Sequence, residues 1–272
     1  MASLRFSTLF SGPGPTFGTI RERTAAIRKV ALPLITVGIV LWLWEETVRA
    51  AFFPTVILPP PMEVWEIFVA QRELMFGHAQ KTFFECLFGF ALAAAAGLGL
   101  ATLITVSRIA REMLYPNLVL FQLIPTIALA PLFVLWFGVG SESRLAYAMC
   151  LALFPIVVAS STGLMNTNPY FLRLCESLTA SRWQILTTVR FPFALPHIFT
   201  GMRIGLTLAI IGVVVGEFIT AQSGIGYLIS YASSSMALAL AAIVFLLGVG
   251  LLLFVMLLLL EFVVNSFFST RS

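Results

Sequence analysis

Residues 86–107 read CLFGFALAAAAGLGLATLITVS, a run without a single charged side chain. A helix needs about 20 apolar residues to cross the hydrocarbon core of a bilayer. Further uncharged runs of at least that length occupy residues 113–141, 145–172 and 218–260. The chain is 60% hydrophobic and 10% charged, whereas soluble domains carry about 25% charged residues. The sequence therefore predicts an all-α, polytopic transmembrane helical bundle and excludes an ordinary soluble protein.

Two shorter or interrupted apolar segments bring the expected number of spans to six. We expect the spans at residues 31–48, 83–106, 115–137, 145–164, 199–220 and 236–261. Residues 1–28 hold scattered Ser, Thr and Arg, without a continuous apolar stretch or a small-residue cleavage site. This composition predicts a flexible cytoplasmic tail and no cleaved signal peptide. Residues 29–272 are predicted to form the transmembrane domain.

Basic residues are distributed unevenly across the six predicted spans. With the N-terminus inside, 12 of the 16 Lys and Arg fall inside, and only Arg49, Arg72, Lys81 and Arg144 fall outside. Because inner loops of membrane proteins are enriched in Lys and Arg, this distribution predicts that both termini are cytoplasmic. The net charge of +4 is then explained by membrane topology, and no nucleic-acid partner is expected.

Residues that catalysis would need are sparse. The chain has no Asp, and neither of its two lysines, Lys29 and Lys81, follows the Gly-rich run of a phosphate-binding loop. His78 and His197 lie far apart, and the three cysteines match no metal-ligand spacing. We therefore expect no catalytic residue, no metal site, no disulfide and no cofactor on this chain.

Ionisable groups inside spans are costly in lipid, so each is a candidate for function. Glu217 lies near the outer end of the fifth predicted span. It could reach the headgroups or pair with Arg144, or it could line a polar path through the membrane. Glu85, near the outer start of the second span, is expected to reach the interface by extending its side chain.

Polar residues near prolines form a second group of path candidates. Pro125 and Pro131 are expected to bend the third span, which is tolerated where protein or a wet cavity satisfies the freed backbone groups. Gln122 and Thr126 could then line such a cavity, or they could hydrogen-bond another helix. Gln222 follows the fifth span, in a linker that we expect to pack against the outer side of the bundle.

Small residues predict close helix packing in the second span. Residues 93–101 read AAAAGLGLA, and small side chains let a neighbouring helix approach closely. Before this span, Pro59, Pro60 and Pro61 exclude a helix, and a short amphipathic helix is expected from Met62 onward.

One charged segment separates the apolar runs, at residues 171–196, FLRLCESLTASRWQILTTVRFPFALP. Its apolar residues Phe171, Leu174, Cys175 and Leu178 recur at helical spacing, which predicts an amphipathic helix. Ser181, followed three residues later by Gln184, is a capping-box pattern for a second helix.

The second helix should present Ile185, Leu186 and Val189 on one side and end at Pro192 and Pro196. The two helices could lie on the lipid headgroups, with arginines toward anionic lipid. They could equally dock in a groove of a cytoplasmic partner. The residues themselves leave both alternatives open.

The order of TASRWQ (179–184), VRFPFALP (189–196) and HIFTGMRIG (197–205) resembles the EAA loop of bacterial binding-protein-dependent ABC transporter permeases. LPPPMEVW (58–65), IPTIALAPLFVLWFGVG (124–140) and GEFITAQSGIGYLI (216–229) agree with this family. The motifs look like the nitrate/sulfonate/taurine-type branch, which also includes permeases for thiamine-pyrimidine precursors. The resemblance covers about residues 55–262.

The resemblance implies a type I ABC importer in a bacterial inner membrane. Two permease copies would form the path, and two separate ATPase subunits, which bind ATP and Mg²⁺, would bind the EAA loops. A periplasmic or lipid-anchored binding protein would deliver the solute. The coupling loop would span about residues 165–197. Its matching positions are Arg173, Leu174, Cys175, Glu176, Leu178, Thr179, Ala180, Ser181, Arg182, Trp183, Leu186, Val189 and Pro196.

The loop departs from the family pattern, which is Glu-Ala-Ala-Arg, two residues, then Gly. Here Arg173 and Glu176 exchange the two charges, and Thr179 replaces the glycine. A left-handed backbone at Thr179 would cost more than it does at glycine. Our hypothesis is that the cognate ATPase carries a matching change of charge. The alternative is a degenerate, weakly coupled loop.

Two other classes of function remain for comparison. A proton-driven secondary transporter would require several buried ionisable residues that relay protons, and inverted repeats. This chain has Glu217 and no evident repeat. A membrane scaffold or lipid-modifying enzyme would require a large soluble domain or clustered catalytic residues, and the sequence shows neither. The expected solute is a sulfonate-, taurine- or nitrate-like anion or a thiamine-pyrimidine precursor.

Overall fold

The computed structural model describes residues 18–50, 52, 54–220, 222–232 and 235–269. It divides into two compact units, Met1–Met62 and Glu63–Ser272. The first unit contains α1 (Gly18–Arg49), whose segment Ala31–Arg49 is long and apolar enough to span a membrane. Residues 18–28 belong to this helix, in keeping with their helix-forming Glu, Arg and Ala residues. Residues 1–17 lie outside the described part.

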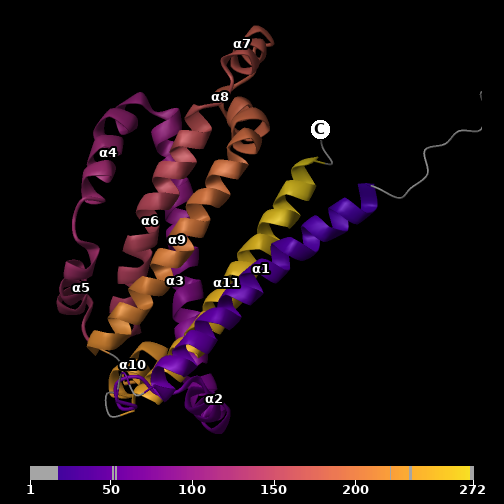
Figure 1. Cartoon of the computed structure of the whole chain (residues 1–272). Coiled ribbons are helices and arrows are strands. Elements are labelled where there is room, and N and C mark those ends of the chain that lie inside the picture. The colour runs from indigo at the N-terminus through magenta and orange to yellow at the C-terminus, as the bar shows by residue number, and fades with distance from the viewer. Residues whose placement is uncertain (1–17, 51, 53, 221, 233–234, 270–272) are drawn as a thin grey trace, which may run out of the picture. The chain divides into compact units, whose positions relative to one another are not determined.

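Within the described residues the regular elements are all helices (Figure 1). After α1 they are α2 (Pro61–Ala70), α3 (Arg72–Val106), α4 (Arg108–Phe121), η1 (Thr126–Leu129), α5 (Ala130–Phe137), α6 (Ser141–Met165), α7 (Pro169–Ser177), α8 (Arg182–Ile185), η2 (Leu186–Arg190), α9 (Phe191–Thr220), α10 (Ile225–Tyr231) and α11 (Met236–Ser269). Five helices are long and apolar enough to span a membrane, or six if the bent pair α4 and η1–α5 counts as one. The prediction of a helical membrane bundle is confirmed.

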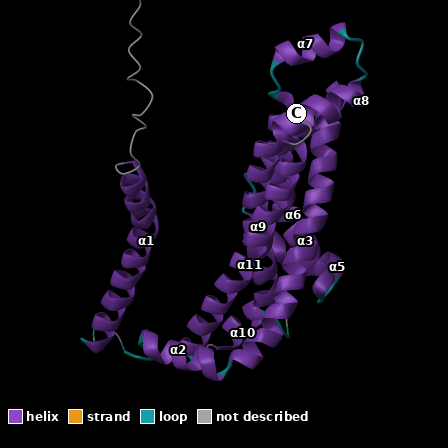
Figure 2. Ribbon diagram, turned by 90° about the vertical axis from the view of Figure 1, so that its right-hand side faces the viewer, coloured by secondary structure: helices purple, strands orange, loops and turns teal. Residues whose placement is uncertain are grey.

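The core of the second unit is the packing of α3, α6 and α9, which run side by side (Figures 1 and 2). Glycines allow this approach: a Cβ on Gly97 of α3 would lie 2.7 Å from Cγ2 of Ile156, and one on Gly205 of α9 would lie 2.8 Å from its Cδ1. The small residues of the second span therefore do admit a neighbouring helix, as predicted. Ile156 of α6 fills the space that both glycines leave.

A close approach of the α6 and α9 backbones gives a stability prediction. A Cβ on Gly212 of α9 would lie 2.8 Å from Cα of Ala148, whereas nothing lies within 4 Å of a Cβ on Gly99. Gly212→Ala should therefore push α9 from α6 and cost about 1–3 kcal/mol. Gly99→Ala gains the same helix propensity without the clash. Thermal unfolding of the two variants in detergent should show a lower midpoint for Gly212→Ala alone, and equal midpoints would contradict the close approach.

The third predicted span is broken. The axes of α4 and η1–α5 differ by 97°, and Pro125, which has no N–H to donate, lies at the break as the N-cap of η1. Pro131, in contrast, is in the first turn of α5 and does not bend it. The hydroxyl of Tyr147 donates to the carbonyl oxygen of Thr126 at 3.0 Å, which fixes η1 against α6.

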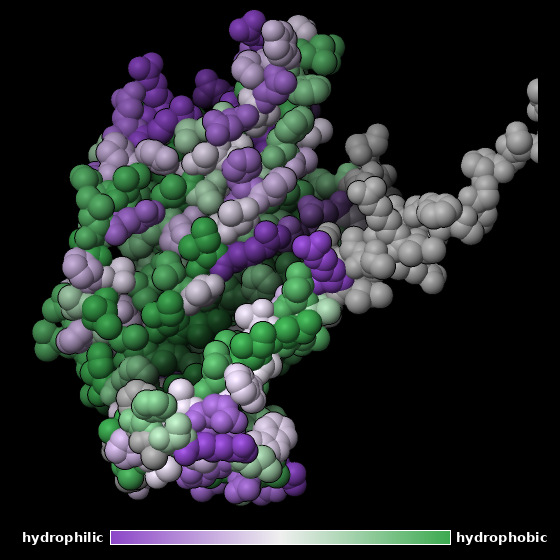
Figure 3. All heavy atoms as spheres, viewed as in Figure 1, coloured by the Kyte–Doolittle hydropathy of each residue, from purple (hydrophilic) through white to green (hydrophobic). Residues whose placement is uncertain are grey.

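The two ends of the second unit differ in their elements. We call them the α7 end, which holds α7, α8 and the corner between α3 and α4, and the α10 end, which holds α2, α10 and the loop between α5 and α6. Figure 3 shows hydrophilic residues gathered at the α7 end and hydrophobic residues over the middle of the helices. This arrangement suits helices that cross a bilayer.

Candidate functional site

The charged segment at the α7 end folds as the sequence predicted, into two helices joined by a turn. Asn168 caps α7 by accepting a hydrogen bond from the backbone N–H of Tyr170 at 3.0 Å, and Pro169 follows at the first helical position. α7 stands beyond the ends of α6 and α9 in both views (Figures 1 and 2). The predicted helix–turn–helix is therefore confirmed, and it projects away from the apolar bundle.

The apolar face of this segment is largely uncovered in the described chain, although the ring of Phe171 packs against that of Phe193 on α9, with 5.4 Å between the ring centroids. α7 contains no buried residue. Leu174 is 56% exposed, Leu178 is 70% exposed and Trp183, on α8, is 69% exposed. The charged Arg173 and Glu176 are also exposed. An uncovered apolar face on a projecting helix is the kind of surface that binds another protein.

The turn after α7 has a left-handed residue at Thr179, the position where the family pattern has glycine. Thr179 has φ +56°, and it is the one non-glycine residue with positive φ in the described part of the chain. Its N–H donates to the carbonyl of Glu176 and the N–H of Ala180 donates to that of Cys175, both at 3.0 Å. This pair of bonds is a Schellman motif, which ordinarily takes glycine at the left-handed position. The left-handed position of the motif is thus taken by a β-branched residue.

Replacing Thr179 by glycine should stabilise the end of α7. The left-handed conformation costs a residue with a Cβ about 1–2 kcal/mol, so Thr179→Gly should slow hydrogen exchange of the Ala180 amide about fivefold or more. Thr179→Val should leave it unchanged or faster. Unchanged exchange in the glycine variant would show that the turn is not strained. Thr188→Gly, in the following helix, is the matched control and should not slow exchange there.

The second helix begins as predicted but does not end as predicted. Gln184 donates its N–H to the hydroxyl of Ser181 at 3.3 Å, and its side-chain oxygen accepts from the N–H of Ser181 at 2.8 Å, which completes the capping box. The expected stop at Pro192 and Pro196 is wrong, because α8, η2 and α9 continue without interruption to Thr220.

The π-turn η2 explains how the helix passes these prolines. It covers Leu186–Arg190 and ends two residues before Pro192, and it includes the predicted loop residues Leu186 and Val189. A π-turn closes its hydrogen bonds over one more residue than an α-helix does. This changes the pairing of backbone N–H and C=O groups near proline, which donates no N–H. Pro196 lies exposed within α9. α8 is consequently joined to a spanning helix by continuous helical backbone.

At the α10 end, Glu217 lies inside the bundle and does not reach the headgroups. It is 1% exposed. One carboxylate oxygen accepts from the hydroxyl of Thr82 at 2.7 Å, and the other accepts from the N–H of Gly226 at 2.7 Å. The alternative that it pairs with Arg144 is also wrong. Both of its oxygens hold neighbouring segments in place.

Arg144 instead forms a two-pronged ion pair with Glu85. Its Nε lies 2.7 Å from one carboxylate oxygen and its Nη2 lies 2.6 Å from the other, and the residues are 4% and 6% exposed. The expectation that Glu85 extends to the interface is therefore wrong. The hydroxyl of Ser141 also donates to Glu85, at 2.8 Å. Opposite charges near the same end of two spans were the signal that could have predicted this pair.

The loop before α10 is fixed to α3 by three residues that sequence reasoning did not select. Lys81 donates to the hydroxyl of Ser223 at 2.7 Å, His78 Nδ1 accepts from the N–H of Gly224 at 3.0 Å, and Thr82 Oγ1 accepts from the N–H of Ile225 at 2.8 Å. Gly224 has φ +112° and no room for a Cβ beside Glu217. The linker is thus packed against the bundle, as expected, and Gln222 lies exposed at its start.

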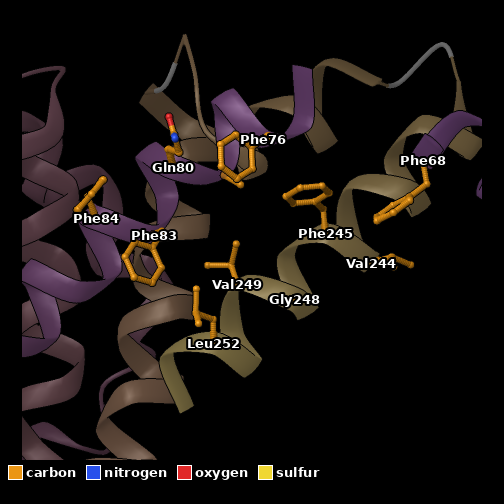
Figure 4. A pocket seen from close by; sticks show the side chains of 11 residues that line it. Phe68, Phe76, Gln80, Phe83, Phe84, Val244, Phe245, Gly248, Val249 and Leu252 are labelled. Atoms are coloured by element: carbon orange, nitrogen blue, oxygen red, sulfur yellow. The ribbon is translucent and has the colours of Figure 1, made fainter. Parts of the chain in front are cut away.

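The remaining path candidates lie on the surface. Gln122 and Thr126 are exposed on either side of the break in the third span. A cavity of about 410 Å³ lies between α2, α3 and α11, and Figure 4 shows phenylalanine side chains around it, with Gln80 as its one amide. None of Glu217, Gln222, Gln122 and Thr126 lines it. Its lining suits hydrocarbon and not a polar solute. No cluster of metal-binding side chains occurs in the described ranges.

The sequence is similar to a known protein family and to several individual proteins. Residues 87–269 match the family described as the binding-protein-dependent transport system inner membrane component. A probable ABC transporter permease of Haemophilus influenzae is 37% identical over 224 residues, which cover 82% of this chain and 91% of that protein. The formylaminopyrimidine transport permease of Halalkalibacterium halodurans is 36% identical over 68% of this chain and 74% of its own length. The taurine transport permease of Escherichia coli is 28% identical over 85% and 90%.

The fold has a counterpart among solved structures. A chain of the MetNI methionine ABC transporter in an inward-facing conformation aligns with a TM-score of 0.58 and 17% identity. The alignment covers 75% of this chain and 98% of that one. At this identity the likeness concerns the fold. The family match and the relative at 37% identity show that this chain belongs to the binding-protein-dependent transport system inner membrane components, the permease subunits of ABC importers.

Proposed function

We propose that the chain is the solute-conducting permease of an ATP-driven importer and that α7 and α8 couple it to a separate ATPase. The observation that carries this proposal is the uncovered apolar face of α7, with Leu174 and Leu178 exposed. The proposed coupling residues are Arg173–Glu176, Leu178–Trp183, Leu186, Val189 and Pro196. Because α8 continues through η2 into α9, a displacement of α8 would move a spanning helix directly.

The proposed partners are inferred from two surfaces that are exposed in the single chain, those of α7 and of the broken third span. Two ATPase subunits, which carry ATP and Mg²⁺, would each receive one α7. A second permease copy, identical or related, would cover the broken third span, since α4 and η1 contain no buried residue. A helix break facing lipid is unfavourable unless protein or water satisfies its backbone. Gln122 and Thr126 would then face a wet path between two copies, with Gln222 near its mouth.

Glu217 has a structural role in the proposed permease. Its carboxylate is fully hydrogen-bonded inside the bundle, so we assign it to positioning the α10 loop and not to contact with solute. This bonding also disfavours the proton-driven alternative, which needs a carboxylate open to exchange with a path.

The bilayer orientation that we propose places the α7 end in the cytoplasm. The corner between α3 and α4 and the α7–η2 segment together carry most arginines of the second unit, which agrees with the positive-inside rule. The N- and C-termini would then be cytoplasmic in a multi-pass protein of a bacterial inner membrane.

The solute is proposed to be small and polar and delivered by an external binding protein. The formylaminopyrimidine and taurine permeases among the relatives support a thiamine-pyrimidine precursor or a sulfonate-like anion. A ligand screen of the binding protein encoded beside this chain would choose between these two classes.

Transport in proteoliposomes tests the proposal. Liposomes with the permease, the cognate ATPase and the binding protein should take up solute only when ATP is present. Liposomes without the ATPase should show none. Uptake driven by a pH gradient alone would overturn the importer assignment.

The exchanged charges of α7 give a separate prediction. Swapping them to the family order, with Arg173→Glu and Glu176→Arg, should weaken association with the cognate ATPase about tenfold, since each side chain would face a like charge on a matched partner. Both residues are exposed, so the fold should be unaffected. Co-purification with the ATPase measures the effect. Unchanged association would contradict the matched-partner hypothesis.

A further inference from the structure

A positively charged cleft lies at the α7 end, between the corner joining α3 to α4 and the segment from α7 to η2. Its volume is about 350 Å³. Four arginines from different segments line it: Arg108 and Arg111 from the start of α4, Arg182 from α8 and Arg190 from η2. Glu176 is the one carboxylate in the lining. Four positive charges and one negative charge leave the lining with a formal charge of +3.

Two of these guanidinium groups are held in place by the ends of spanning helices. Arg111 donates from Nη2 to the carbonyl of Thr105 at 3.1 Å and from Nε to that of Ile104 at 3.3 Å, at the end of α3. Arg190 donates from Nη1 to the carbonyl of Leu164, at the end of α6, at 3.4 Å. These contacts use only part of the five N–H donors that each guanidinium carries. Both side chains line the cleft.

The positive charge of the cleft is not balanced by carboxylates of the described chain. Of the four arginines, Arg108 alone forms an ion pair there, with Glu112 at 2.9 Å. Both side chains of that pair are strongly exposed, and such pairs contribute little. Arg182 is exposed and forms no ion pair within the described ranges. Like charges gathered in this way are unfavourable unless an anion joins them.

We propose that this cleft binds a phosphate group. Arginine donates two parallel hydrogen bonds to phosphate oxygens, and several arginines from separate segments can share the non-bridging oxygens of one phosphate group. The volume falls within the range of small-molecule sites, so the cleft admits a phosphate with its attached group. A bound phosphate would join the α3–α4 corner to α8 and η2. The site is therefore separate from the solute path and bears on the mobility of the coupling segment.

Two sources can supply this phosphate. The cleft lies at the ends of α3, α6 and α9, which is the level of lipid headgroups when these helices cross a bilayer, and basic pockets at that level bind anionic headgroups. A free phosphate ion from solution has the same chemistry. The experiment therefore uses both probes.

The test measures binding to the full-length chain purified in detergent. Thermal shift titrations with inorganic phosphate, against chloride at equal ionic strength, report the free ion. Nanodiscs of phosphatidylglycerol, compared with phosphatidylcholine, report the lipid source through retained lipid in native mass spectrometry. The double variant Arg108→Gln with Arg182→Gln removes the two exposed arginines of the cleft. The matched control, Arg173→Gln with Arg72→Gln, removes the same charge from exposed positions outside the cleft.

We expect the wild type to bind at least one of the two probes and the cleft variant to bind it about tenfold more weakly, with the control within about twofold of the wild type. Binding of phosphatidylglycerol alone would assign the site to lipid, and binding of inorganic phosphate as well would assign it to the free ion. Absence of binding to the wild type would overturn the proposal, as would equal weakening in the control. A cleft variant that binds both probes normally but loses the ATPase would also overturn it, and would assign the cleft to the partner interface.

Discussion

Replacement of Arg144 by leucine is expected to prevent accumulation of folded protein. Glu85 would remain in the bundle, 6% exposed, with its charged partner gone and only the hydroxyl of Ser141 donating to it. Breaking one side of a buried ion pair costs about 3–5 kcal/mol, because the remaining charge stays buried without compensation. That is a large share of the stability of a small domain. The yield of monodisperse protein after size-exclusion chromatography and the thermal midpoint in detergent measure the loss.

Removing both charges should restore much of that loss. In the double variant Glu85→Leu with Arg144→Leu, no buried charge remains, and apolar replacements for a buried pair are often close to neutral. The ion pair of Arg203 with Glu261 supplies a matched comparison, since it also joins two helices but is partly exposed. Arg203→Leu should therefore cost less than Arg144→Leu. A double variant no more stable than Arg144→Leu would show that the lost contacts of Arg144 to Ser141 and Thr220, and not the stranded carboxylate, cause the defect.

Local signals in the sequence predicted the α7 end well. The spacing of Phe171, Leu174 and Leu178, the capping pair of Ser181 and Gln184, and the missing glycine at Thr179 all act within a few residues. Their consequences can therefore be worked out from one short stretch. Apolar runs located the spanning helices for the same reason, because the length of hydrocarbon to be crossed is fixed.

The α10 end could not be predicted in this way, because its partners are far apart in the chain. Arg144 lies 59 residues from Glu85, and Glu217 lies 135 residues from Thr82. Nothing in a single sequence states which distant helices become neighbours. The expected interfacial position of Glu85, and the expected headgroup contact or Arg144 pairing of Glu217, therefore missed their actual partners, Arg144 and Thr82. The predicted helix end at Pro192 was wrong for a different reason. The local rule that proline ends a helix was outweighed by a π-turn, which kept α8 continuous with α9.

Replacement of Leu174 and Leu178 by aspartate is expected to abolish ATP-driven uptake without unfolding the permease. Each leucine is largely exposed in the single chain, so its loss removes little packing. In the proposed complex the two would be buried against the ATPase, and burying one leucine side chain contributes about 1.5–3 kcal/mol. Losing both should weaken association about a hundredfold or more, with the buried carboxylates adding to the loss.

Val139→Asp separates this effect from a general penalty for exposed aspartates. Val139 is 75% exposed and lies between α5 and α6 at the α10 end, away from α7. Co-purification with the cognate ATPase should fail for the α7 variant and stay at the wild-type level for Val139→Asp, with similar thermal midpoints for both permeases alone. If the α7 variant still bound the ATPase and supported uptake, the apolar face of α7 would not be the docking surface. If it bound but did not transport, these leucines would instead transmit the motion, and the continuous helix from α8 into α9 would be the route by which they do so.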